Sequence, residues 1–115
     1  MRTILFIILL AASCTSAIAS IDTNRLANAI YLAEGGVKAR SPYGICSVKV
    51  RNAVEARSVC LRTIKHALDD YRGGEAGFID FLADRYCPAK VDPVGNVNWK
   101  KNVKFLYAKK NLKKD

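Results

Sequence analysis

The stretch AIYLAEGGVKARSPYGICS, residues 29–47, contains one acid, Glu34, at the point where an apolar helix pattern stops. Apolar side chains before it recur at helical spacing, and the pair Gly35–Gly36 ends the pattern. The end of a helix carries about half a negative charge, so a carboxylate placed there is repelled and its protonated form is favoured. Burial against apolar neighbours would act in the same direction. Glu34 is therefore a candidate general acid, with an exposed and unfavourably placed surface residue as the alternative.

The rest of the sequence predicts an all-α domain of about four helices, because apolar residues recur with helical period and glycine or proline separates the segments. The four predicted helices cover about residues 23–34, 52–71, 75–86 and the residues after Asn98. Asp22 or Thr23 is expected to cap the first helix, and Asn98 the fourth. Residues 89–97, with Pro93 and Gly95, are expected to form a polar loop.

The first residues resemble a secretory signal peptide rather than part of the fold. Arg2 supplies a positive charge, residues 4–12 form a short apolar run, and residues 17–19 match a cleavage site. Cleavage there would remove residues 1–19 and leave a domain of residues 20–115. The competing interpretation is a lipoprotein signal in which Cys14 becomes the lipidated first residue. Both interpretations predict an exported protein, periplasmic or secreted.

The charge is strongly positive, at a formal net +9, and it is concentrated at the C-terminal end. Residues 100–115 contain seven lysines and one acid. This lysine-rich end is either a solvated helix face or a surface attracted to a polyanion outside the cytoplasm, such as an anionic cell-wall polymer or lipid headgroups. Nucleic acid is not an expected partner because export separates the protein from it, and we expect a monomer.

Metal and cofactor sites are not expected. The cysteines are far apart, no C-x-x-C occurs, and His66 is the only histidine. His66 lies among polar neighbours on the predicted second helix, so we interpret it as a surface residue. No glycine-rich phosphate-binding loop and no nucleophile–histidine arrangement is present in the sequence.

Three blocks of the sequence together resemble a known family. The segments are Ala29-Ile30-x-x-x-Glu34-Gly35-Gly36 with Ser41-x-x-Gly44-Ile45-Cys46-Ser47, then residues 83–87, then residues 98–103. Their order is similar to that of soluble lytic transglycosylases and goose-type lysozymes. The resemblance implies a small lysozyme-like helical fold and an activity on the MurNAc–GlcNAc glycan strands of peptidoglycan, with Glu34 as the general acid.

The resemblance also implies roles for residues around the acid. Tyr86 corresponds to a tyrosine that lies near the glutamate and orients it. Ser47 stands where the family carries a substrate-contacting amide, and Cys46-Ser47 replaces the usual Met-Gln. Tyr43 either lines the sugar groove or packs beneath the loop.

A single carboxylate is sufficient for the substrate-assisted chemistry that the resemblance implies. The acid protonates the glycosidic oxygen, and the sugar's own groups complete the reaction. Hydrolysis would need a second carboxylate, unlike this mechanism. Asp80 and Asp84 are the candidates, with surface charges as the alternative for both.

The mature chain has three cysteines, which predicts one pair and one free thiol. Cys46 stands where the family carries an apolar residue, which implies a buried free thiol. A disulfide between Cys60 and Cys87 is therefore expected, and it would contribute about 3–4 kcal/mol by loop closure. Pairing of Cys46 with either of them stays open.

Two further functions are compatible with the sequence. One is a non-catalytic lysozyme-like module that binds glycan or a partner protein, which the replaced Met-Gln pair favours. The other is a small secreted cationic protein that acts on membranes.

Overall fold

The computed structural model describes residues 21–45, 49–73 and 77–109, and over these residues the domain is all-α, as predicted. The predicted signal peptide, Cys14, Cys46, Ser47 and the last six residues lie outside the described ranges. The elements, in chain order, are α2 (Thr23–Ala33), the 3₁₀ turns η1 (Gly36–Lys38) and η2 (Pro42–Gly44), and then α3 (Ala53–Asp70), α4 (Gly77–Tyr86) and α5 (Pro93–Tyr107).

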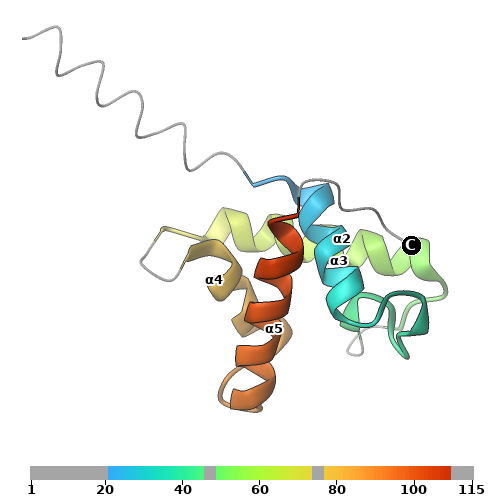
Figure 1. Cartoon of the computed structure of the whole chain (residues 1–115). Helices are drawn as coiled ribbons and strands as arrows, with labels where there is room; N and C mark the ends of the chain where they lie inside the picture. Colours follow the sequence, from blue (N-terminus) through green and yellow to red (C-terminus); the bar gives the residue numbers. More distant parts are fainter. Residues whose placement is uncertain (1–20, 46–48, 74–76, 110–115) are drawn as a thin grey trace, which may run out of the picture.

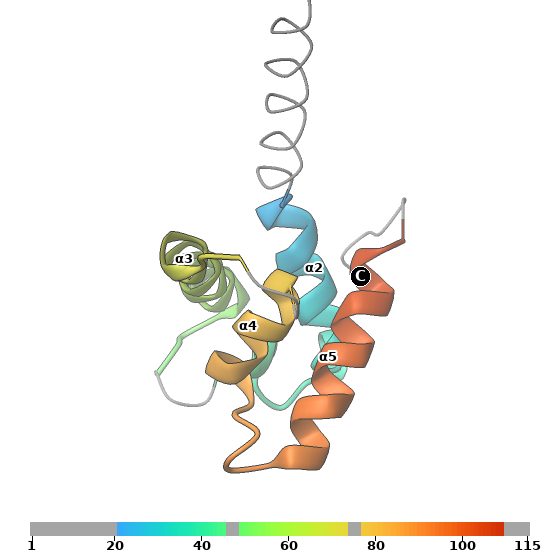
Figure 2. The same cartoon turned by 90° about the vertical axis from the view of Figure 1, so that its left-hand side faces the viewer.

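Helix α2 forms the centre of the domain. It packs against α3, α5 and both 3₁₀ turns, while α4 packs against α3 and α5. In Figures 1 and 2, α3 runs across the other helices, and α4 lies beside α5. The shared core is made of apolar side chains from all four helices, the largest fully buried ones being Leu26, Ile30, Ile64, Leu82 and Val103.

Glu34 lies at the C-terminal cap of α2. Asp22 is the N-cap, and its Oδ1 accepts a hydrogen bond from the Arg25 N–H at 3.1 Å, which confirms one of the two predicted caps. Glu34 is the C-cap residue, and its N–H donates to the Ile30 carbonyl. Gly35 follows with φ +116°, a left-handed conformation that glycine adopts without strain. The glycine pair therefore ends the helix directly after the acid.

Helix α3 agrees with the prediction within one residue at each end. Asn52 is its N-cap and accepts a hydrogen bond from the Glu55 N–H at 2.9 Å. Its buried residues, Ala56, Cys60, Ile64 and Ala67, follow a helical period and form one apolar stripe. His66 is exposed on this helix, as expected.

The predicted start of the fourth helix is wrong. Helix α5 begins at Pro93, so the expected loop of residues 89–97 contains its first turn and Asn98 is interior to it. Proline fits the first turn of a helix because the N–H that it lacks would have no intrahelical partner. The Oδ1 atom of Asp92 caps this end by accepting from the Gly95 N–H at 2.9 Å. A Cβ at position 95 would collide with the Asp92 carboxyl, so glycine permits this close cap.

Replacing the true cap should destabilise the domain, and replacing the predicted one should not. We expect Asp92→Ala to lower the free energy of unfolding by about 1 kcal/mol. Asn98→Ala is the matched control, because Asn98 is exposed and interior to α5. Thermal denaturation of both variants measures the difference. Equal effects of the two substitutions would contradict the assignment of the cap.

Candidate functional site

The Glu34 carboxyl lies directly against the backbone of η2. An ideal Cβ built on Gly44 would come within 2.6 Å of both Cδ and Oε2 of Glu34. Glu34 itself is half-buried. The carboxyl is therefore turned toward the loop that follows the helix, and the position 44 backbone can approach it only because no side chain intervenes. The alternative of an exposed surface glutamate does not describe this arrangement.

The loop that carries Gly44 is held in place by Tyr43 and Arg57. Tyr43 has φ +60° and ψ +15°, which is unusual for a residue other than glycine. Its ring packs on Tyr31 with centroids 5.1 Å apart, and its hydroxyl accepts a hydrogen bond from Arg57 Nη1 at 3.1 Å. The same Arg57 nitrogen donates to Asn28 Oδ1 of α2 at 2.8 Å. These contacts connect α3, α2 and the loop, and they fix the backbone against which Glu34 lies.

Tyr43 is accordingly not a groove residue, and its assignment to substrate binding is wrong. The side chain is 0% exposed, because the left-handed backbone turns the ring under the loop and into the core. The second of the two predicted roles, packing beneath the loop, is the one that the structure confirms.

Aromatic and sulfur-containing side chains from the other helices surround the acid. Trp99 of α5 stacks on Tyr86 of α4, with ring centroids 5.2 Å apart and an interplanar angle of 21°. Cys60 of α3 is fully buried and lies beside the Tyr86 hydroxyl. Residues separated by up to 65 positions in the sequence thus converge on the end of α2. The Glu34 charge is among the causes that raise the Tyr86 pKa, so the two residues lie near each other, and the role of Tyr86 in orienting the acid stays a prediction.

Two polar atoms in this group are buried without a hydrogen bond of good geometry. They are Trp99 Nε1 and Tyr86 Oη. The contact of Trp99 N–H with the Glu34 carboxyl falls short of that geometry, yet it still favours the charged carboxylate. A buried donor with an incomplete partner costs free energy, and such atoms are tolerated at sites where a ligand can complete them.

Burial raises the pKa of Glu34. Loss of solvation is the larger effect, and the Trp99 N–H opposes it by stabilising the charged form. The carboxyl therefore keeps its proton to a higher pH than an exposed glutamate does, as the sequence predicted. Desolvation also raises the pKa of the Cys60 thiol to about 11 and that of the Tyr86 hydroxyl well above its ordinary value. Both groups are neutral near pH 7.

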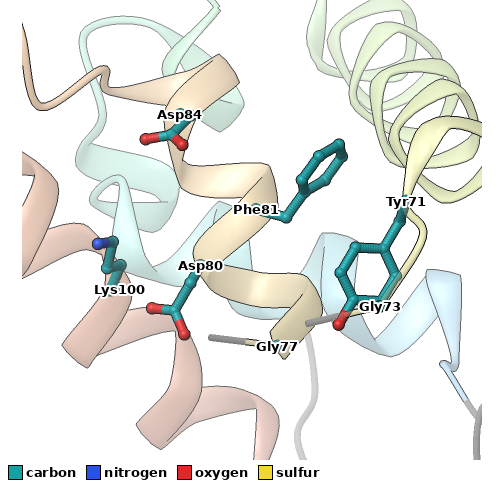
Figure 3. A pocket seen from close by; sticks show the side chains of 7 residues that line it. All are labelled: Tyr71, Gly73, Gly77, Asp80, Phe81, Asp84 and Lys100. Carbon is teal, nitrogen blue, oxygen red and sulfur yellow. The ribbon is translucent and has the colours of Figure 1, made fainter. Parts of the chain in front are cut away.

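The two aspartates considered as a second carboxylate line a cavity that does not include Glu34. This cavity has a volume of about 230 Å³ and is lined by Tyr71, Gly73, Gly77, Asp80, Phe81, Asp84 and Lys100. Figure 3 shows Asp80 and Asp84 on the side of α4 that faces Lys100. Asp80 also forms an ion pair with Lys104, at 2.9 Å. None of the residues around Glu34 lines this cavity, and neither aspartate is among the groups that shift the Glu34 pKa.

The predicted disulfide between Cys60 and Cys87 is not present, and both residues are free thiols. Cys60 is buried beside Tyr86. Cys87 lies past the end of α4 and faces the start of α5, where its Sγ would be 3.1 Å from a Cβ on Gly95. Helices α3 and α4 pack against each other, but the two cysteine side chains contact different neighbours. Cys46, the third cysteine, and the candidate Ser47 lie outside the described residues.

Sequence reasoning missed the parts that Gly44, Trp99 and Cys60 play around the acid. Gly44 was part of the motif, but its close approach to Glu34 has no signal in the sequence beyond the residue type. Trp99 lies within the resembling block 98–103, but its residue type gives no sign that it contacts Glu34. Within the described ranges, no group of three or more residues that could bind a metal is found, and no helix is long and apolar enough to cross a membrane.

No protein-family model, curated protein or solved structure matches this chain. The function is therefore inferred from the residues around Glu34, together with the sequence blocks that resemble the transglycosylases.

Trp99→Phe should raise the pKa of Glu34 further. The substitution keeps a ring to stack on Tyr86 but removes the N–H that stabilises the carboxylate. The titration of a ¹³C-labelled Glu34 carboxyl, followed by NMR, measures the shift. Tyr86→Phe is the matched control, since it removes a hydroxyl from the other stacked ring and should leave this pKa nearly unchanged. A lower pKa in Trp99→Phe would contradict the role of the indole.

Proposed function

We propose that this protein is an exported enzyme that cleaves the MurNAc–GlcNAc glycan strands of peptidoglycan, with Glu34 as its general acid. The observation that carries the proposal is the half-buried carboxyl at the end of α2, with a raised pKa, seated against the Gly44 backbone. A general acid needs to hold its proton near the pH of the reaction, and desolvation is the usual means of achieving this.

The chemistry follows from one carboxyl group. Protonated Glu34 gives its proton to the glycosidic oxygen as the bond to the sugar's anomeric carbon breaks. The N-acetyl group of the cleaved sugar supports the developing positive charge. A hydroxyl of the same sugar then attacks the anomeric carbon and loses its proton to the Glu34 carboxylate, which restores the acid. The product carries an anhydro end.

The surroundings of Glu34 favour this reaction over hydrolysis. Hydrolysis by inversion or retention uses a second carboxylate to activate water or to attack the sugar. Asp80 and Asp84 line a cavity that does not include Glu34, and Asp80 forms an ion pair with Lys104. The Trp99 N–H is the polar side-chain group that contacts the acid, and we assign to it the positioning of Glu34. Tyr86 supports this role through the ring that stacks on Trp99.

Mass spectrometry of the fragments released from purified peptidoglycan by the mature protein tests the proposal. Anhydro-ended fragments are expected from the wild type. Reducing-ended fragments would replace the mechanism with hydrolysis and direct attention to Asp80 and Asp84. With a folded protein and a transglycosylase of known activity as positive control, the absence of fragments would contradict the proposal and favour a non-catalytic glycan-binding module.

A further inference from the structure

The outer face of α5 combines exposed apolar side chains with lysines. Val94, Val97, Lys101 and Phe105 recur at helical spacing and lie on the same side of the helix, opposite the buried Trp99 and Val103. The exposed fractions are 69% for Val94, 59% for Val97 and 64% for Phe105. In Figure 2, α5 lies at the edge of the domain. We call these four residues, together with Lys109, the α5 outer face.

The charge of this face is positive without compensation from its own helix. The sequence Pro93–Tyr107 contains three lysines and no acid. Lys104, at the border of the face, pairs with Asp80, but Lys101 forms no ion pair with any described residue. The Nζ atom of Lys109 lies over the Phe105 ring, 4.8 Å from its centroid. The sequence continues past the described residues with Lys110, Lys113 and Lys114.

A cationic helix face with a large exposed aromatic residue is complementary to one class of surface. Lysines attract anionic headgroups, and apolar side chains between them can enter the boundary between headgroups and acyl chains. A soluble polyanion would use the lysines but would give the valines and the phenylalanine nothing to contact. Exposed apolar residues bordered by charge typically mark interaction sites.

We propose that the α5 outer face binds the surface of an anionic phospholipid bilayer. Phe105, Val97 and Val94 lie against the apolar boundary, and Lys101 and Lys109 contact the headgroup phosphates. This binding does not depend on the function proposed for Glu34. It would hold the domain at a membrane with α5 parallel to the surface.

Co-sedimentation of the mature protein with vesicles tests this surface. Wild type should bind vesicles that contain phosphatidylglycerol, bind pure phosphatidylcholine far more weakly, and lose binding as salt rises. Phe105→Ala should weaken binding about tenfold. Lys101→Gln and Lys109→Gln should each weaken it about fivefold. Val54→Ala and Lys65→Gln are the matched controls, because both residues are exposed on α3 and lie outside the proposed surface.

Two results would overturn the proposal. The first is no binding of wild type to anionic vesicles at low salt. The second is binding that depends on the lysines but changes no more with Phe105→Ala than with Val54→Ala, which would identify a general polyanion surface instead. Phe105→Trp gives a direct readout, since insertion should shift its fluorescence to shorter wavelength on addition of anionic vesicles. Release of soluble glycan fragments should be unchanged in all these variants, so failure of one proposal is distinguishable from failure of the other.

Discussion

Glu34→Gln is expected to abolish the release of glycan fragments and, at neutral pH, to raise the thermal stability of the fold. Glutamine has nearly the same shape and keeps a side-chain oxygen that the Trp99 N–H can face, but it cannot donate a proton to the glycosidic oxygen. General acid catalysis contributes about 10²–10⁴-fold to a rate, so the loss should fall at least in this range. Mass spectrometry of the released fragments measures it, and cleavage by the variant at wild-type rate would remove Glu34 from the mechanism.

The gain in stability follows from the direction of the pKa shift. Burial raises the Glu34 pKa above its ordinary 4.5, so the folded state binds this proton more tightly than the unfolded state. Ionisation of Glu34 therefore destabilises the fold as pH rises. Below about pH 4.5 the Glu34 carboxyl is protonated in both the folded and the unfolded state. In that range its titration should not change the difference in the free energy of unfolding between wild type and variant. The advantage of glutamine should grow as pH rises through the raised pKa and then become constant.

Thermal unfolding of the two proteins across this pH range measures the effect. Asp69→Asn is the matched control, because Asp69 is an exposed acid on α3. It should show no comparable gain with pH. If Glu34→Gln were less stable than wild type at neutral pH, the desolvated carboxyl would be making a compensating contact that the structure does not contain. A lower stability caused by a buried acid would fit the proposed catalytic role, because functional residues commonly trade stability for activity.

Gly44→Ala is expected to destabilise the domain and to displace the Glu34 carboxyl. The new Cβ would meet Cδ and Oε2 of Glu34 at 2.6 Å, so one of the two residues has to move. The backbone at Gly44 also has φ +68°, which costs an alanine about 1–2 kcal/mol. The clashing atoms are the end of a flexible side chain, so the carboxyl turns away and overpacking adds less, about 1 kcal/mol or below. Fragment release should fall together with stability, because the acid no longer occupies its position.

Gly73→Ala separates the two causes. Gly73 has φ +86°, close to that of Gly44, but no atom of the described residues lies within 4 Å of an added Cβ. This variant should therefore show the backbone cost alone. The double variant Gly44→Ala/Glu34→Ala should recover most of the additional loss, because the clashing carboxyl is gone. Equal destabilisation by Gly44→Ala and Gly73→Ala, measured by thermal unfolding, together with unchanged fragment release by Gly44→Ala, would contradict the close contact between Gly44 and Glu34.

Local rules explain which parts of the fold were predictable. Asp22 and Asn52 cap their helices with side chains that reach only three residues ahead, so their sequence neighbourhood is sufficient to identify them. The same reasoning failed at Asn98. The true start signal is Asp92 followed by Pro93, and it lies in a segment that its proline and glycine indicate to be a loop. The glycine that suggested a loop is the residue that permits the Asp92 cap.

The sequence by itself determined the all-α class, the ends of α2 and α3 to within a residue or so, and the presence of one acid where the first helix ends. Only the tertiary structure decided which side chains meet that acid and which do not. Helical periodicity identifies the face that is buried, but it does not specify which other helix covers it. That choice depends on packing between segments far apart in the sequence. The packing brings Trp99 and Tyr86 close to Glu34. It also buries Tyr43 in the core and leaves Cys60 and Cys87 as free thiols.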